Sequence, residues 1–262
     1  MLKKRLIFTL LYGDGNYNHS RNFNLQKAGN VRWKDENYEF LSMSQSIDEL
    51  IVLDVSRECK SIENLIQELS ILTKNCFMPI SAGGGIKNLK NASALIRNGA
   101  DKIVINSLLF QNENEIKKIV NHLGSQAVVG SIDYFINSKG ERKVYTENGS
   151  NELDLSLEDA VKFCESIGIG ELYITCINKD GKGNGYDLDG IKLVINSSNL
   201  PIIASGGAGN FIHFAEALNI NSLSAVSTAN LFNFMLDGLA ESRKELLEKN
   251  YNLAIFRDFI NE

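Results

Sequence analysis

Eight short apolar segments alternate with amphipathic segments along this chain of 262 residues, and this alternation predicts an α/β protein. A repeat narrows the prediction, because segment 79–85 returns as 201–207 and segment 47–50 returns as 169–172, both at an offset of 122 residues. Two equal halves of four strand–helix units close a ring more naturally than they extend a sheet, and a doubly wound open sheet is the competing arrangement. The sequence therefore predicts a single (βα)8 TIM barrel over 1–262, with half-barrels at about 1–122 and 123–244 and a tail at 245–262.

The predicted strands are mostly continuous apolar runs, as expected for parallel strands that are buried on both faces. In chain order they cover 5–11, 49–54, 78–82, 102–105, 127–133, 171–176, 201–205 and 223–227. Leu11 ends the first strand and Asp133 ends the fifth, again 122 residues apart. The repeat thus places an apolar side chain in one half where the other half has a carboxylate.

Helical patterns fill the segments between the strands. Apolar residues recur at helical spacing at positions 62, 65, 66 and 69, and again at 89, 92, 95 and 96, where Asn88 and Gly99 are start and stop signals. Ser156 and Asp159 fit a capping box at the start of another helix. The connections at 12–33 and 134–155 are the long ones, and we expect them to be loops over the catalytic face.

The composition is that of an ordinary soluble globular protein, with 44% hydrophobic and 23% charged residues. The net charge is −5, so the chain has no excess of positive charge and nucleic acid is not an expected partner. Apolar segments are too short to span a bilayer, and the basic start of the chain lacks a cleavage site for a signal peptide. The four cysteines and three histidines are dispersed. This pattern favours a reduced, cytoplasmic protein, and no metal or cofactor is expected.

Glycine-rich turns follow the third and seventh predicted strands. Gly83-Gly84-Gly85 and Gly206-Gly207 each precede a helix, where backbone amides suit a phosphate group. The neighbouring strand ends add Asn106-Ser107 in one half and Thr228-Ala229 in the other. We therefore expect an elongated ligand with a phosphate at each end, although tight turns alone also explain the glycines.

Three aspartates, Asp54, Asp133 and Asp180, lie at or just beyond the C-terminal ends of strands. A carboxylate inside the rim of a barrel is desolvated and so is placed to act as a general acid or base. Asp133 is the strongest candidate because it ends an otherwise apolar strand. Helix capping is the alternative role for such an aspartate.

Charged residues begin four strands at the opposite end of the predicted barrel. They are Arg5, Glu49, Lys102 and Glu171. Acidic and basic residues that alternate around a barrel floor can form a closed ring of ion pairs. By default, such a layer indicates stability rather than catalysis.

Several strings resemble the HisF family, the cyclase subunits of imidazole glycerol phosphate synthase, and the resemblance covers nearly the whole chain. The strings are 1–5, 47–50, 82–86, 99–102, 124–126, 180–181, 185–187 and 204–209. Strings 124–126 and 185–187 separate the chain from the related HisA isomerases. The resemblance implies a lyase-type enzyme that works beside a HisH-like glutaminase. Ammonia released there passes up the barrel and attacks a bisphosphate substrate at the far face.

The resemblance also assigns roles to residues of this sequence. The gate that admits ammonia is matched by Arg5, Glu49, Lys102 and Glu171, and Gln126 matches a glutamine on the ammonia path. One phosphate site is matched by Gly85, Asn106 and Ser107, next to Gly84. The other is matched by Asp180, Gly181, Gly207, Thr228 and Ala229, next to Gly206. Asp133 matches the second of two catalytic aspartates, and we expect a heterodimer with the glutaminase near Asp101, Lys102 and Gln126.

The departures from the family pattern cluster on the catalytic face. Leu11 occupies the place of the first catalytic aspartate, and Asp14 is a poor substitute because it lies beyond the strand. His19 stands where the family has a lysine, and Asn148 stands where it has a serine. Closing an imidazole ring needs proton transfer on two sides of the substrate, and losing one general acid costs about 10²–10⁴ in rate. The sequence therefore predicts altered chemistry.

Four functions stay open, and the first is preferred. In HisF-like paralogues of surface-polysaccharide pathways, ammonia is used to make an acetamidino group on a sugar, and the resemblance implies that role here. The second is the ordinary cyclase of histidine biosynthesis, with an unusual active site. The third is a non-catalytic conduit that activates its glutaminase and hands ammonia on. The fourth and weakest is a HisA-like isomerase, which relies on the same acid pair.

Overall fold

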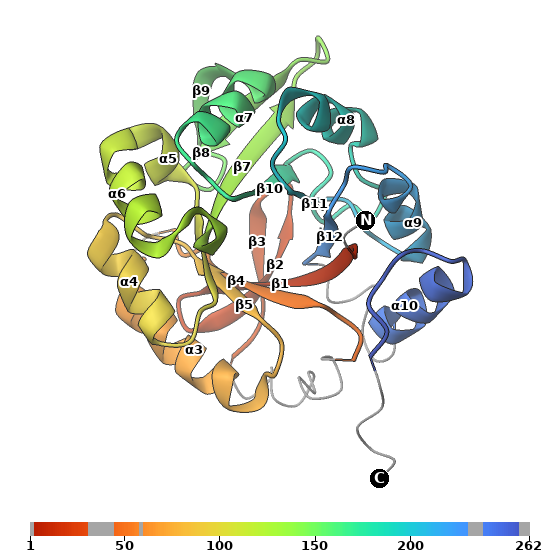
Figure 1. Cartoon of the computed structure of the whole chain (residues 1–262), viewed down its shortest axis with the longest axis horizontal. Coiled ribbons are helices and arrows are strands. Elements are labelled where there is room, and N and C mark those ends of the chain that lie inside the picture. Colours follow the sequence, from red (N-terminus) through yellow and green to blue (C-terminus); the bar gives the residue numbers. More distant parts are fainter. Residues whose placement is uncertain (1–2, 31–44, 58–59, 230–237, 257–262) are drawn as a thin grey trace.

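The computed structural model describes residues 3–30, 45–57, 60–229 and 238–256. At its centre eight parallel strands form a ring, and helices pack around the outside (Figure 1). In ring order the strands are β1 (Arg5–Gly13), β4 (Glu49–Asp54), β5 (Ile80–Gly83), β6 (Lys102–Ile105), β7 (Val128–Ile136), β10 (Glu171–Cys176), β11 (Ile202–Ser205) and β12 (Ala225–Thr228). Because β12 pairs with β1 and β10 pairs with β7, the ring closes. The predicted (βα)8 barrel is confirmed.

Three predicted strands coincide with the observed strands β4, β6 and β10 at both ends. Each of these strands begins with a charged residue and continues as an apolar run, so the change in polarity marks its start. β4 and β10 are buried on both faces along almost their whole length, as the continuous runs predicted.

The long connections predicted after β1 and β7, at 12–33 and 134–155, contain regular structure over their described residues, and residues 31–33 lie outside the described chain. Each contains an antiparallel hairpin that continues from its barrel strand. One hairpin is β2 (Asn16–Arg21) and β3 (Asn24–Gly29), and the other is β8 (Arg142–Thr146) and β9 (Asn151–Ser156). Asp14 and Gly15 both have positive φ between β1 and β2, the geometry that favours a tight turn.

The helices cover the outside of the ring, and several begin where the sequence indicated. Their bounds are α3 (Ile62–Asn75), α4 (Leu89–Arg97), α5 (Ser107–Gln111), α6 (Glu113–Leu123), α7 (Leu157–Ser166), α8 (Leu188–Ser197), α9 (Phe211–Leu218) and α10 (Gly238–Glu248). Asn88 caps α4 by accepting a bond from the backbone N–H of Asn91, and Ser156 caps α7 through the N–H of Asp159. Among the described helices, none is long and apolar enough to cross a membrane.

Among the described residues, buried apolar side chains form two separate clusters. The larger cluster fills the layer between the strands and the helices. The smaller cluster lies inside the ring and contains Ile7, Ile51, Val104, Val129, Tyr173, Ile203 and Ala225. The inside of the barrel is therefore apolar at mid-height, between a charged end and a polar end.

Candidate functional site

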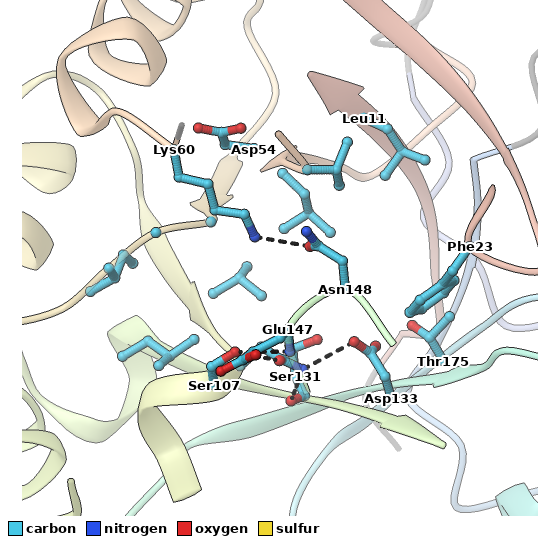
Figure 2. Close-up of a pocket in the computed structure, with 18 of the residues that line it drawn as sticks. Leu11, Phe23, Asp54, Lys60, Ser107, Ser131, Asp133, Glu147, Asn148 and Thr175 are labelled. Atoms are coloured by element: carbon cyan, nitrogen blue, oxygen red, sulfur yellow. Dashed lines mark hydrogen bonds between the residues drawn. The ribbon is translucent and has the colours of Figure 1, made fainter. Parts of the chain in front are cut away.

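A cavity of about 850 Å³ opens at the end of the barrel where the strands terminate. Both halves of the chain line it, from Leu11 on β1 to Ala229 just after β12. Figure 2 shows side chains from several strands and from both hairpins pointing into one space. A concave site of this size at this end of a TIM barrel is where ligands bind in this fold.

Asp133 on β7 projects into this cavity. Its carboxylate accepts a hydrogen bond from Asn106 Nδ2 at 3.1 Å, and Asn106 Nδ2 also donates to the Ser131 carbonyl at 3.0 Å. Burial raises the pKa of Asp133 to about 7, and the Asp180 carboxylate adds to this rise while Lys60 and Asn106 oppose it. A carboxyl group that titrates near neutral pH can both give and take a proton.

Leu11 lines the same cavity from β1 and is almost fully buried. Figure 2 shows Leu11 and Asp133 on different sides of the cavity. Asp14 is exposed in the β1–β2 turn, where its backbone N–H donates to Ser56 Oγ at 3.1 Å. The acids that line the cavity, among the described residues, are Asp54, Asp133, Glu147 and Asp180. Asp14 therefore does not take the place beside Leu11.

The first predicted phosphate site lies together at the cavity wall. Gly84, Gly85, Asn106 and Ser107 all line the cavity. Gly84 has a φ of 105°, and a Cβ there would lie 2.3 Å from the Asp54 carbonyl oxygen, so strand packing alone requires glycine. Ser107 Oγ accepts a bond from the Glu147 backbone N–H at 3.2 Å. The structure thus brings these four residues together beside Asp133.

The β2–β3 hairpin packs on two residues of the second predicted phosphate site, Asp180 and Gly181. The Asp180 carboxylate accepts bonds from Ser20 Oγ and from the Phe23 backbone N–H, the latter at 3.0 Å. A Cβ on Gly181 would lie 2.0 Å from the Ser20 carbonyl oxygen. Of the six residues in this set, Asp180 and Ala229 line the cavity, whereas Gly181, Gly206, Gly207 and Thr228 do not. Residues 230–237, which follow this set, lie outside the described chain.

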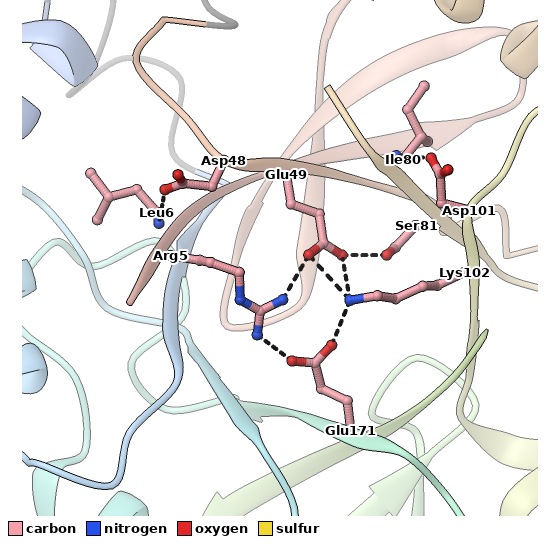
Figure 3. A network of polar contacts seen from close by, with 9 residues as sticks. All are labelled: Arg5, Leu6, Asp48, Glu49, Ile80, Ser81, Asp101, Lys102 and Glu171. Carbon is pink, nitrogen blue, oxygen red and sulfur yellow. Dashed lines mark hydrogen bonds and ion pairs between the residues drawn. The ribbon is translucent and has the colours of Figure 1, made fainter. Parts of the chain in front are cut away.

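A closed ring of ion pairs occupies the opposite end of the barrel, as the sequence predicted (Figure 3). Arg5 bonds Glu49 at 2.8 Å and also bonds Glu171, while Lys102 bonds Glu171 at 2.8 Å and Glu49 at 3.3 Å. Burial opposes the charge on Arg5, but Glu171 and Glu49 more than offset this, so the pKa of Arg5 is raised. Each acid thus contacts both bases, and the ring spans the floor of the barrel.

Comparison with known proteins decides the family. A model described as "Histidine biosynthesis protein" matches residues 30–235. The chain is 40% identical over 245 residues to a protein of Parasynechococcus marenigrum that is named provisionally as imidazole glycerol phosphate synthase subunit hisF2, covering 94% of this chain and 91% of the relative. It is 32% identical to imidazole glycerol phosphate synthase subunit HisF of Petrotoga mobilis, covering 97% of this chain and 100% of the relative. For HisF of a Thermotoga species the identity is 34%, over 97% of this chain and 99% of the relative. The chain belongs to the HisF-like family of histidine biosynthesis proteins.

Tyr173 lies inside this HisF-like barrel, between the floor and the cavity. Its ring belongs to the apolar cluster inside the barrel, and its side chain also lines the cavity. Its hydroxyl lies 2.8 Å from Ser205 Oγ and 3.2 Å from Thr9 Oγ1, and Thr9 lies 2.7 Å from Ser227 Oγ. A layer of hydroxyl groups thus separates the apolar interior from the cavity. No sequence motif indicates this layer, because a single tyrosine in an apolar strand has no distinctive pattern.

Gln126 does not join the ion-pair ring in this HisF-like barrel. It lies in a short 3-10 turn, Ser125–Ala127, just before β7, and it is exposed. Asp101 is also exposed near the floor, and its carboxylate accepts a bond from the Ile80 backbone N–H at 2.8 Å. The predicted interface residues therefore lie on the floor side of the barrel, where the strands begin.

Two further residues of the cavity were missed by the sequence analysis as ligand-binding candidates. Lys60 lies between β4 and α3, and its Nζ donates to Asn148 Oδ1 at 2.9 Å. Asn148 lies in the β8–β9 turn with a φ of 58° and was noted only as a departure from the family pattern. The sequence offers no motif for Lys60, because it stands in a polar loop with no repeated spacing.

Proposed function

We propose that this chain is the synthase subunit of a glutamine amidotransferase pair. Ammonia from a HisH-like glutaminase enters at the ring of Arg5, Glu49, Lys102 and Glu171 and moves through the barrel to the cavity, where it reacts with a phosphorylated small molecule. The observation that carries this proposal is the order of layers along the barrel, from a charged floor through an apolar interior to a cavity that holds Asp133. An apolar passage favours uncharged ammonia over the ammonium ion.

Asp133 is the group that handles the proton of the incoming nitrogen in this proposal. When ammonia attacks an electrophilic carbon that carries a leaving oxygen group, a C–N bond forms, the nitrogen becomes positively charged and must lose a proton, and the C–O bond breaks as the oxygen group leaves. The Asp133 carboxylate, with its pKa raised to about 7 chiefly by burial, is available in its basic form at neutral pH and can accept that proton. Leu11 offers no second proton-transfer group on the other side of the cavity.

A cavity with Leu11 on one side and Asp133 on another suits nitrogen transfer better than a ring closure that needs proton transfer on two sides of the substrate. We therefore propose that the acceptor is a sugar of surface-polysaccharide biosynthesis that becomes amidinated. The greater identity to the relative named hisF2 than to the two HisF subunits, 40% against 32% and 34%, is in keeping with a paralogue.

The second candidate function is the standard cyclase of histidine biosynthesis. The observation that favours it is the family itself, because relatives named as HisF subunits match this chain over their whole length. Asp133 and the first predicted phosphate site (Gly84, Gly85, Asn106 and Ser107) would serve this reaction as well. The third candidate, a conduit without chemistry of its own, differs from both because it does not need Asp133.

A complementation experiment separates the two enzymatic candidates. A bacterial strain that lacks HisF and requires histidine receives this gene together with the gene for its glutaminase. We expect no growth without histidine, whereas an authentic HisF gene in the same vector restores growth. Growth with this chain would overturn the proposed acceptor and establish the cyclase.

A second experiment distinguishes an enzyme from a non-catalytic conduit, and it requires that the acceptor has been identified. If Asp133→Asn still supports ammonia-dependent product formation, the chain acts only as a conduit.

A further inference from the structure

Lys60 is the one cationic side chain that lines the cavity without being exposed, among the described residues. Three cationic side chains line the cavity, and of these Arg57 and Lys87 are exposed whereas Lys60 is half-buried. Figure 2 shows the Lys60 side chain extending into the cavity, with its ammonium group directed toward Asn148. This position places a positive charge inside the site.

The backbone of the first glycine turn packs against the aliphatic part of the Lys60 side chain at Gly85. A Cβ on Gly85 would lie 2.9 Å from Lys60 Cβ, so the absence of a side chain at Gly85 lets the two segments meet. Gly85 has a φ of 71°, which favours glycine independently. The ammonium group is thus carried on a stem that packs on the turn predicted to bind phosphate.

The ammonium group of Lys60 has a neutral partner in this structure. Its Nζ donates to Asn148 Oδ1, and it forms no ion pair with any residue of the described ranges. Burial lowers the pKa of Lys60, with Arg57 adding to the fall, while Asp54, Asp133 and Glu147 act in the opposite direction. Asp54 is held in its own turn, where its carboxylate accepts the Ser56 backbone N–H at 2.9 Å. Partial burial costs a cation part of its solvation free energy, and a neutral partner restores little of it. Binding of an anion therefore stabilises such a cation.

We propose that Lys60 is the cation that binds the phosphoryl group of the substrate at the Gly84–Gly85 turn, with Asn148 orienting its ammonium group. An ammonium group is a suitable point charge for phosphate, and turn amides complete such a site. The proposal deepens the proposed function, since it rests on a phosphorylated substrate in this cavity. The two predicted phosphate sites would then differ in charge. Lys182, the counterpart of Lys60 at the repeat offset of 122 residues, is exposed and does not line the cavity.

Lys182 therefore provides a matched control for a binding experiment. The full chain, labelled with ¹⁵N, is titrated with inorganic phosphate, and the dissociation constant is read from the NMR shifts of the Gly84 and Gly85 amides. We expect Lys60→Met to weaken phosphate binding at these amides at least about tenfold at low ionic strength, since it removes a charge-assisted contact. We expect Lys182→Met to bind phosphate like the wild type.

Two additional measurements keep the proposal falsifiable if Lys60→Met folds poorly. Lys60→Arg keeps the charge, and its affinity should stay within about threefold of the wild type. Acetate, which carries a single charge, should shift the two amides only at higher concentration than phosphate. Equal phosphate affinity of Lys60→Met and wild type, no shift of the Gly84 and Gly85 amides in the wild type, an arginine variant as weak as the methionine variant, or equal affinity for acetate would each overturn the proposal. The titration uses neither glutaminase nor ammonia, so its failure is distinct from failure of the proposed function.

Discussion

Replacing Asp133 with Asn should make the barrel more stable at alkaline pH while removing its proton-transfer group. The carboxylate is placed in a cavity where burial disfavours its charge, which raises its pKa to about 7. Asparagine keeps an oxygen for the hydrogen bond that Asn106 Nδ2 donates, so the change removes the charge with little change in shape. The effect on stability therefore isolates the cost of the charge.

The magnitude follows from the pKa. An aspartate in an unfolded chain has a pKa of about 3.9, so a folded value of about 7 lies about three pH units higher. Each unit corresponds to about 1.4 kcal/mol, which sets an upper limit of about 4 kcal/mol. Water in the open cavity screens the charge, and about 2 kcal/mol is the expected effect.

The direction in which stability changes with pH depends on whether the folded or the unfolded state binds the Asp133 proton more tightly. Because the folded pKa is raised, the folded wild type holds a proton that the unfolded chain releases between about pH 4 and pH 7. The wild type therefore loses stability as the pH rises through this range, and the loss is complete above about pH 7. Asp133→Asn does not have this loss, so its advantage over the wild type grows with pH.

Urea unfolding at pH 5 and at pH 8 measures this advantage. We expect the free energy of unfolding of Asp133→Asn, relative to the wild type, to increase by about 1–2 kcal/mol between the two pH values. Asp154→Asn is the control, because Asp154 is fully exposed on β9 and should show no such change. If Asp133→Asn and the wild type show the same pH dependence, Asp133 does not titrate near neutrality and the proton-transfer argument fails.

Three further predictions concern the packing around the barrel. Asp48→Asn should lower the free energy of unfolding by about 3 kcal/mol in urea, because it leaves the buried guanidinium of Arg243 without the carboxylate that it contacts at 2.9 and 3.0 Å; an unchanged midpoint would contradict this. Gly84→Ala should cost at least about 2 kcal/mol more than Gly15→Ala in thermal unfolding, since a Cβ meets the Asp54 backbone at Gly84 and nothing within 4 Å at Gly15. Burial raises the pKa of the Cys164 thiol to about 12, so iodoacetamide at pH 8 should leave Cys164 unmodified in the native protein, and rapid modification detected by mass spectrometry would show that the site is open.

The barrel strands could be predicted because burial on both faces leaves a continuous apolar signal. The start of β4, β6 and β10 is also marked by the charged residues of the floor ring. The hairpins β2–β3 and β8–β9 carry no such signal, since their strands are short, polar and partly exposed. The pair Asp14-Gly15 was the available sign of a hairpin, because it favours the turn that joins β1 to β2.

The candidate site could be predicted only where a residue stands at the end of a strand. Asp133, Gly84 and Asn106 lie at such positions, and the structure gathers them at one cavity. Lys60 comes from a loop and packs on Gly85, which lacks a side chain, and this tertiary contact has no counterpart in local sequence. The packing of the β2–β3 hairpin on Asp180 likewise depends on two segments that are 157 or more residues apart.

The role of this chain as the ammonia-accepting subunit is tested most directly by the glutaminase activity of the purified pair. The rate of glutamine hydrolysis by the HisH-like subunit is measured alone and with an equimolar amount of this chain, while the mass of the complex is followed by light scattering. The account predicts a one-to-one complex and a rate at least about tenfold higher in the pair, which corresponds to about 1.4 kcal/mol of coupling. Two separate proteins with an unchanged rate of hydrolysis would contradict it.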